Sequence, residues 1–323
     1  IMRNDITDIG GLAVGQAHDG TVRTGVTVCL FDAPAIAAID VRGGGPGTRE
    51  SDVLRPGGLV EAVDAIVLSG GSVYGLGAAD AVCAALGAEG RGFALIPRPG
   101  VPVSPIVPAA ILYDLANGGA KDWGDTPPYG ALGRAALADA RHARPVVQGK
   151  AGAGYGAMAG TLPGGTGSAS ARTSDGIIVA ALACVNSFGS VRVPGTRSYW
   201  AAPFERDGEF GGVRFVTTPL EELEDWGEAK FTPAPRENTT LAIVATDAAL
   251  TPDQARRIAV MAQDGMARAI RPVHTPFDGD VVFAASTARQ PLPEPAALSV
   301  ARIGSLAADC LARAIARGVH AAT

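Results

Sequence analysis

The 323-residue sequence contains few lysines and few aromatic residues, and it carries no excess of positive charge. Only 5% of its residues are aromatic, lysine occurs three times, and the formal net charge is −5. A chain of this charge offers no broad basic surface, so we expect neither nucleic acid nor an anionic membrane as a partner.

The sequence also lacks the spacings of a disulfide framework or a metal site. Its four cysteines are far apart, with no CxxC pair, and its four histidines show no HExxH or similar spacing. We therefore expect free thiols in a reducing compartment, and no metal. These residues are Cys29, Cys83, Cys184 and Cys310, and His18, His142, His274 and His320.

Long apolar segments are absent as well. The longest stretch, 65–79, is interrupted by glycines and bracketed by Asp64 and Asp80, and it is too short to span a bilayer. The first residues, IMRNDITDIGG, lack the cationic and then apolar pattern of a signal peptide. We expect a cytoplasmic protein, and its 47% hydrophobic residues suffice for a thick core.

Short runs rich in Val and Ile alternate with glycine-rich turns and with helical patterns, which predicts a layered α/β fold. Thr251, Pro252 and Gln254 have the spacing of a capping box at the start of one helix. The expected strands are 26–31, 65–68, 177–185, 241–246 and 281–285, and the expected helices are 74–86, 252–270 and 298–318.

One segment differs from the rest in composition. Residues 192–237 are polar and acidic, rich in Pro and Gly, and include Trp200 and Trp226. We interpret them as a long surface loop, and such loops in compact domains are usually functional. The loop ends at Asn238-Thr239, where a strand begins abruptly.

Several familiar site patterns are incomplete. The glycine-rich segments 43–47 and 152–156 match neither GxGxxG nor a P-loop and are better explained as turns. The Leu68-Ser-Gly-Gly-Ser72 segment does not have the GxSxG spacing of a serine hydrolase. Asp278-Gly279-Asp280 lacks the rest of a calcium-binding EF-hand loop and fits a solvated turn.

A threonine nucleophile remains to be considered. A Thr hydroxyl needs a base, and a free α-amino group on the same residue, titrating at about 7.7–8.0, is suited to that role. Cleavage before Thr239 would expose such an amine next to a polar loop. The residues alone leave this open, because threonine at the start of a strand also reflects ordinary β-propensity.

Nine motifs in order carry a family resemblance along nearly the whole chain. They are Ile6-Thr-Asp-Ile-Gly-Gly-Leu-Ala-Val-Gly15, Arg42-Gly-Gly-Gly-Pro-Gly-Thr-Arg-Glu50, Ser69-Gly-Gly-Ser-Val-Tyr-Gly-Leu76, Pro105-Ile-Val-Pro-Ala-Ala110, Gly152-Ala-Gly154, Gly165-Thr-Gly-Ser-Ala-Ser170, Ala183-Cys-Val-Asn186, Asn238-Thr-Thr-Leu241 and His274-Thr-Pro-Phe-Asp-Gly-Asp280. With them the chain resembles the self-processing aminopeptidase/D-amidase–esterase family. That family includes β-aminopeptidases and nylon-oligomer endo-hydrolases.

The resemblance implies a fold and a maturation step. The fold is a single-domain α-β-β-α sandwich of the N-terminal-nucleophile-hydrolase type over residues 1–323. Self-cleavage between Asn238 and Thr239 would give an α chain of residues 1–238 and a β chain of residues 239–323. Relatives assemble into homotetramers or larger rings of αβ units, and none of this chemistry requires a cofactor.

The resemblance also assigns roles to five residues. The Thr239 hydroxyl would attack the scissile amide while its amine takes the proton. Asn186 would supply the oxyanion-hole amide, and Tyr113 would help to hold the nucleophile or the oxyanion. Asp278 and Asp280 would orient the Thr239 ammonium or hold a substrate amine. A core role for Tyr113 and a turn-forming role for one aspartate remain the simpler alternatives.

Three further residues are expected to line the site: Thr161, Thr240 and His274. Nylon-hydrolase relatives carry a Lys where Thr161 stands, and Lys150 is not a safe substitute for it. Family members often have Asp where this chain has Ser190. Both departures concern substrate preference more than the basic mechanism.

These expectations define the predicted activity. The chain should be an N-terminal-threonine amidohydrolase that releases residues, including β- or D-residues, from small peptides with a free amine. One alternative is an endo-type hydrolase of 6-aminohexanoate (nylon) oligomers. Two others are a Thr-dependent acetyltransferase, although members of that class lack the motif at 42–50, and a scaffold that never processes.

Overall fold

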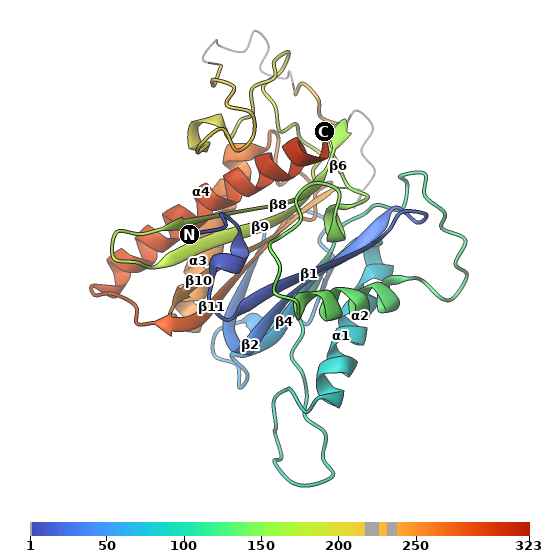
Figure 1. The fold of residues 1–323 in the computed structure, drawn as a ribbon, viewed down its shortest axis with the longest axis vertical. Coiled ribbons are helices and arrows are strands. Elements are labelled where there is room, and N and C mark those ends of the chain that lie inside the picture. The colour runs from blue at the N-terminus through green and yellow to red at the C-terminus, as the bar shows by residue number, and fades with distance from the viewer. Residues whose placement is uncertain (1, 217–225, 231–237) are drawn as a thin grey trace.

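A computed structural model describes residues 2–216, 226–230 and 238–323 (Figure 1). The helices are α1 Gly77–Ala88, α2 Tyr129–Ala140, α3 Pro252–Ala269 and α4 Ala296–Ala322. The strands are β1 Leu12–Asp19, β2 Thr24–Val41, β3 Thr48–Arg49, β4 Ala62–Ser69, β5 Ala109–Ile111, β6 Met158–Ala159, β7 Leu162–Pro163, β8 Gly165–Arg172, β9 Ile178–Asn186, β10 Thr239–Ala248 and β11 Val281–Gln290. Short 3-10 turns are η1 Ile6–Asp8, η2 Asp52–Leu54, η3 Ser72–Leu76, η4 Gly152–Gly154 and η5 Ala202–Phe204.

One long strand connects the two halves of the sheet. The hydrogen-bonded order is β3-β5-β4-β2-β11-β10-β9-β8, and β1 pairs with the first part of β2. The 18-residue β2 pairs with β1 and β4 along its first part and with β11 along its last six residues. The β10–β11 and β4–β5 pairs are parallel, and the other pairs along this order are antiparallel.

Three apolar interfaces separate four layers. Along β10, Leu241 and Ile243 face the half-sheet of β2 and β4, whereas Ala242 and Val244 face α3 and α4. The far face of β2 and β4 packs against α1 and α2. Figure 1 shows the two helix pairs on opposite sides of the strands. The expected α-β-β-α layering is confirmed. Because both faces of the inner strands are buried, their sequences are continuously apolar.

The five expected strands and three expected helices are present, with shifted ends. The expected helix 74–86 begins as the turn η3 before α1. The capping box of α3 is formed, since Gln254 N donates to Thr251 Oγ1 (3.3 Å) and Thr251 N donates to Gln254 Oε1 (2.9 Å). Sequence reasoning missed β1, β8 and α2. Strand β8 reads GTGSASAR because α4 lies directly on it: a Cβ on Gly167 would collide with the Ala314 carbonyl.

The predicted surface loop 192–237 is only partly described, because residues 217–225 and 231–237 lie outside the described residues. Its described part up to residue 216 is irregular apart from η5. The surface expectation is wrong for Tyr199 and Phe210, which are 3% and 1% exposed and pack in the α4 interface. The loop is therefore anchored to the body of the protein.

A buried ion pair completes this anchor. Glu209, in the loop, accepts hydrogen bonds from Arg313 Nε (2.5 Å) and Nη2 (2.9 Å) on α4, and one from Asn4 Nδ2 (2.8 Å). Burial raises the pKa of Glu209, but the hydrogen bond and charge of Arg313, with Asn4 and Arg317, outweigh it and lower the pKa overall. The carboxylate is thus held in its charged form.

We predict that Glu209→Gln lowers the free energy of unfolding by about 3–5 kcal/mol, because it leaves the buried Arg313 without a counter-charge. The contribution of Glu209 is fully present above its ordinary pKa of 4.5 and is lost as the pH falls through the lowered folded-state pKa. Urea unfolding of both proteins between pH 3 and 7 measures this.

The control is Asp32→Asn, which breaks an exposed pair with Arg289 and should cost less than about 1 kcal/mol. Equal losses in the two variants, or a Glu209→Gln effect that grows toward pH 3, would show that the loop is not anchored in this way.

Candidate active site

The predicted nucleophile, Thr239, is the first residue of β10, and β10 lies between β9 and β11. Thr239 pairs with Asn186, the last residue of the antiparallel β9. On the other side, Leu241 pairs with Val281 at the start of the parallel β11, which Asp280 directly precedes. The strand directions alone therefore bring Asn186 and Asp280 to either side of Thr239.

The Asn238–Thr239 peptide bond is held from two directions. Gly279 N donates to the Asn238 carbonyl oxygen at 2.8 Å, and the Thr239 hydroxyl donates to the same oxygen at 2.5 Å. Asn238 and Asp278 form a parallel bridge that keeps this geometry. A Cβ on Gly279 would lie 2.6 Å from Thr239 Oγ1, so only glycine fits here. Two donors on one carbonyl oxygen polarise that carbonyl toward nucleophilic attack.

The Asn238 side chain is fully buried, and among the described residues neither its amide nitrogen nor its amide oxygen has a hydrogen-bond partner. A buried polar group left unsatisfied costs about 1–3 kcal/mol. The residue before Thr239 is thus held in an unfavourable environment.

The two aspartates hold different parts of the backbone. Asp280 accepts a hydrogen bond from Thr240 N (2.8 Å) through Oδ1, and its Oδ2 faces His274 N (3.1 Å) and His274 Nδ1 (2.8 Å). Asp278 accepts from Thr275 N (3.0 Å) and Thr275 Oγ1 (2.6 Å) through Oδ2. Asp280 therefore fixes Thr240, the residue after Thr239, and Asp278 shapes the loop around Gly279.

The carboxyl group of Asp278 has a perturbed pKa. Burial, and then the nearby charge of Asp280, raise the pKa of Asp278 to about 6, although hydrogen bonds from Thr275 and Phe188 N oppose the rise. Asp278 therefore changes its protonation near neutral pH, directly beside Gly279 and the Asn238 carbonyl.

The glycine-rich segment 43–47 packs on this loop and is not a phosphate cradle. Gly44 N donates to the Thr275 carbonyl (3.2 Å), and Gly45 N donates to the Asp278 carbonyl (2.8 Å). A Cβ on Gly44 would lie 2.7 Å from the backbone of Pro276. These glycines allow two backbones to approach closely, as expected for structural glycines.

Asn186 has a fixed amide orientation. Its Oδ1 accepts from Met158 N (2.9 Å), and its Nδ2 donates to the Tyr113 carbonyl (2.9 Å). Because a backbone N–H only donates and a carbonyl only accepts, the two ends of the amide cannot be exchanged. The Tyr113 carbonyl is therefore in direct contact with Asn186.

A groove adjoins Asn186. A cavity of about 150 Å³ is lined by Tyr113, Asp114, Ala116, Asn117, Gly156, Met158, Asn186 and Lys230. A second cavity of about 450 Å³ is lined by Gly20, Arg23, Asn117, Lys150, Tyr155, Gly156, Ala157, Met158 and Pro163. Because the two cavities share Asn117, Gly156 and Met158, we treat them as one feature, the Asn186 groove.

The other expected lining residues differ in their placement. Thr240 is fully buried, and its hydroxyl has no hydrogen-bond partner in the part of the chain that the structure describes. His274 contacts Asp280, as described. Thr161 is exposed between β6 and β7, where its N–H donates to the Glu228 carbonyl (2.7 Å). Sequence reasoning missed Gly279 and Lys230. The only local signal for Gly279 was its position between two aspartates.

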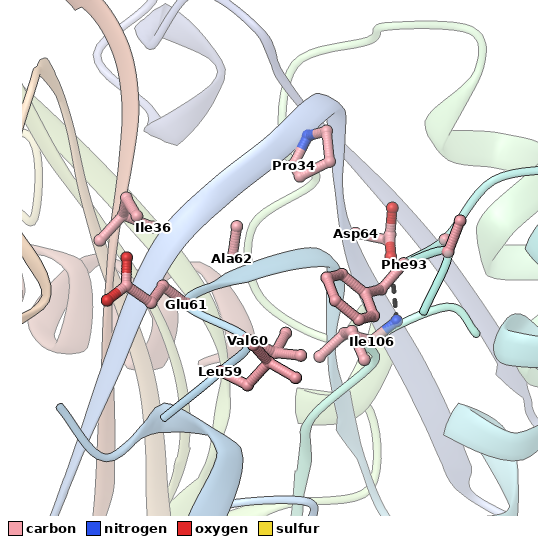
Figure 2. Close-up of a pocket in the computed structure, with 11 residues that line it drawn as sticks. Pro34, Ile36, Leu59, Val60, Glu61, Ala62, Asp64, Phe93 and Ile106 are labelled. Carbon is pink, nitrogen blue, oxygen red and sulfur yellow. Dashed lines mark hydrogen bonds between the residues drawn. The ribbon is translucent and has the colours of Figure 1, made fainter. Parts of the chain in front are cut away.

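Another cavity, of about 410 Å³, lies elsewhere (Figure 2). Leu59, Val60, Phe93 and Ile106 form its apolar wall in Figure 2. Its Ile36 pairs with Ser286, six residues along β11 from Asp280. None of the residues that line it is among the predicted site residues.

Within the described residues, no group of three or more His, Cys, Asp or Glu side chains could hold a metal ion. The four cysteines are free thiols, as expected. In the same part of the chain, no helix is both long and apolar enough to cross a membrane.

Comparisons with known proteins identify the family of the chain. The profile of Peptidase family S58 matches residues 4–323. An uncharacterised aminopeptidase of Mycobacterium tuberculosis (strain ATCC 25618 / H37Rv) is 43% identical over 339 residues, covering 98% of this chain and 93% of the relative. A 6-aminohexanoate-oligomer endohydrolase of Kocuria sp. (strain KY2) is 31% identical over 293 residues, covering 88% and 76%.

Solved structures share the fold. A β-aminopeptidase of Burkholderia sp. matches with a TM-score of 0.69 at 23% identity, covering 98% of this chain and 86% of that one. The L-aminopeptidase D-Ala-esterase/amidase of Ochrobactrum anthropi matches with a TM-score of 0.70 at 21% identity, covering 99% and 86%. The latter is described as a new variant of the Ntn hydrolase fold. The expected fold type is thereby confirmed.

The raised pKa of Asp278 predicts a specific pH dependence of stability. The stability that its protonated form contributes is fully present below the ordinary pKa of 3.8 and is lost as the pH rises through about 6. We expect the unfolding free energy to fall between pH 4 and 7 by roughly 1–3 kcal/mol relative to Asp278→Asn. Denaturant unfolding of the protein with Asp278 and of the Asp278→Asn variant measures this. Both proteins also carry Thr239→Ala, so that the Asn238–Thr239 bond stays uncut in each. Parallel pH curves would contradict the assignment.

Proposed function

We propose that this chain, which belongs to Peptidase family S58 and is therefore a peptidase-type hydrolase, matures by cutting itself before Thr239. One observation carries this proposal: the Thr239 hydroxyl and Gly279 N both donate to the carbonyl oxygen of the bond that would break. This contact supports the proposal, because the proposed nucleophile, its target and a donor for the developing charge would then be together before the cut.

The proposed cleavage is an N→O acyl shift followed by hydrolysis. Thr239 Oγ1 attacks the Asn238 carbonyl carbon, and the oxyanion is stabilised by Gly279 N–H. The C–N bond breaks, the Thr239 nitrogen takes the hydroxyl proton, and an ester links Asn238 to Thr239 Oγ1. Water then hydrolyses the ester, leaving an Asn238 carboxylate and a Thr239 with a free amine.

In the mature enzyme, the same hydroxyl would attack a substrate amide. The new Thr239 amine accepts the hydroxyl proton and passes it to the leaving group. Asn186, fixed by Met158 N and the Tyr113 carbonyl, stands at the strand position paired with Thr239 and would stabilise the oxyanion. Asp278 and Asp280, on the β11 side, would hold the ammonium form of the amine. No cofactor takes part.

The substrates we propose are small peptides with a free amine. Higher identity to the aminopeptidase relative (43%) than to the 6-aminohexanoate-oligomer endohydrolase (31%) favours this over nylon oligomers. The exposed position of Thr161 is consistent with that choice, because the residue at the place of the nylon-hydrolase Lys does not line the Asn186 groove.

Residues 1–238 and 239–323 would remain one peptidase domain after the cut. Strand β10 of the second piece is hydrogen-bonded between β9 of the first piece and β11 of its own. Removing β10 would expose the two apolar interfaces that it lines, one with the half-sheet of β2 and β4 and one with α3 and α4. We therefore expect the two pieces to stay together. We further propose that these αβ units form a homotetramer, which sedimentation of the mature protein tests.

We predict that Thr239→Ala stays a single chain without amidase activity, because it lacks the attacking hydroxyl. Intact mass spectrometry under denaturing conditions measures this, together with reading the N-terminus of any fragment. The wild type should give two masses, the smaller beginning Thr239-Thr240-Leu241. The control, Thr239→Ser, keeps a hydroxyl and should still be cut. Cleavage at this bond in Thr239→Ala would refute the mechanism.

We predict that Asn186 and Gly279 serve different steps. Asn186→Ala should still cut itself but lose about 10²–10³ in kcat, as removal of an oxyanion donor does. Gly279→Ala should fail to cut, because its Cβ would displace the Thr239 hydroxyl. Mass spectrometry and amide turnover separate the two outcomes. An uncut Asn186→Ala chain, or its unchanged turnover, would contradict this division.

A further inference from the structure

Two of the three lysines of this chain line the Asn186 groove, and the third contacts a residue that lines it. Of its 27 Lys and Arg residues, only Lys121, Lys150 and Lys230 are lysine, and they are far apart in the sequence. Lys230 lines the cavity that contains Asn186, and Lys150 lines the adjoining one. Lys121 Nζ donates to the side chain of Asn117 (3.0 Å), which lines both cavities.

Arg23 adds a fourth positive charge to the same groove. It lines the larger cavity, and its guanidinium donates to the Asn117 carbonyl (2.9 Å). Lys150 and Arg23 are exposed, so their charges face solvent and any ligand that enters. In a chain with a net charge of −5, this is a local reversal of sign.

Two described carboxylates near the groove are hydrogen-bonded to other groups. Asp114 accepts from Thr24 Oγ1 (2.6 Å) and Gly71 N (2.7 Å) and is 3% exposed. Burial, chiefly, raises its pKa to about 6. Asp19 accepts from the backbone N–H groups of the turn that follows it. In the described part of the chain, neither carboxylate is hydrogen-bonded to Lys150 or forms an ion pair with it.

The opposite charges lie on opposite sides of Thr239. The sheet order is β11-β10-β9-β8, with Asp278 and Asp280 directly before β11 and Asn186 at the end of β9. The groove extends from Asn186 toward Lys150, whose neighbour Gly149 pairs with Thr166 of β8. Negative charge thus flanks the nucleophile on the β11 side and positive charge on the β8 side.

Building on the proposed hydrolysis at Thr239, we propose that the Asn186 groove binds the free carboxylate of the leaving group, so that the preferred substrates are short amides with an amine at one end and a carboxylate at the other. The amine end would lie beside Asp278 and Asp280, and the carboxylate end beside Lys150. The amide bond attacked by Thr239 would then lie between the charges at the two ends of the substrate, and these charges would fix the direction in which the substrate binds.

Strand spacing sets the length of such a substrate. Gly149 pairs with Thr166, Thr166 with Cys184, and Cys184 with Leu241 of β10. At about 4.8 Å per strand, Gly149, the residue before Lys150, lies about 14 Å from Leu241 of β10. An extended peptide spans about 3.3–3.6 Å per residue, and the flexible four-carbon stem of Lys150 can shorten the gap that the substrate must span. Two or three residues beyond the cleaved bond are therefore sufficient.

The test compares matched substrates on the full-length, self-processed protein. Trialanine, its all-D isomer and β-alanyl-dialanine are each supplied as the free acid and as the C-terminal carboxamide. We expect the free acid of the best substrate to have a kcat/KM about three- to tenfold above that of its carboxamide, mainly through a lower KM. The ratio should fall as salt is raised to about 1 M, because exposed charges are screened.

Variants assign the preference to the groove. Lys150→Gln should bring the acid-to-carboxamide ratio close to 1, and Lys150→Glu should invert it. Lys230→Gln should reduce it. The matched control is Arg257→Gln, which removes one exposed positive charge from α3 and should leave the ratio unchanged.

The outcomes distinguish this inference from the proposed function. Equal kcat/KM for acid and carboxamide, or a preference that survives Lys150→Glu, overturns the carboxylate groove while leaving amide hydrolysis at Thr239 intact. A chain that stays uncut and hydrolyses neither form overturns the proposed function and this inference with it.

Discussion

The pairing of β10 between β9 and β11 is the constraint on which the rest of the site depends. Because β10 begins at Thr239, its antiparallel partner must end at Asn186 and its parallel partner must begin just after Asp280. The Asn186 amide and the Asp278 and Asp280 carboxylates thus flank Thr239, the proposed nucleophile. The same pairing buries both faces of β10. The position of Thr239 is therefore held by the interface with the half-sheet of β2 and β4 and by the interface with α3 and α4.

Much of the fold could be predicted from the sequence, because the inner strands are buried on both faces and therefore read as apolar runs. Strand β8 could not, since its α4-facing positions are Gly165, Gly167, Ala169 and Ala171, and small residues carry little strand signal. The burial of Tyr199 and Phe210 in the segment after residue 192 could not be predicted either, because it depends on contacts with distant residues. The anchor of this segment, the Glu209–Arg313 pair, joins residues 104 positions apart, and composition does not show such a partner.

Some residues of the candidate site could be predicted from local motifs, whereas other features depend on contacts between distant segments. Thr239, Asn186, Asp278 and Asp280 stand in local motifs, so resemblance was sufficient to nominate them. The contact of Gly279 with the Asn238 carbonyl and the gathering of the three lysines exist only once distant segments meet. Lysine scarcity was visible in the composition, but its meaning depended on where the fold places those few side chains.

The buried amide of Asn238 would give the proposed maturation a direction. In the uncut chain, that side chain is sealed from water, and among the described residues neither of its polar atoms has a hydrogen-bond partner. Hydrolysis of the bond to Thr239 would turn Asn238 into a chain end, whose amide would then be able to hydrate. Rejoining the pieces would mean dehydrating the amide again, at about 1–3 kcal/mol for each unsatisfied group, together with a new carboxylate. The burial of this one side chain would thus oppose reversal of the proposed cut.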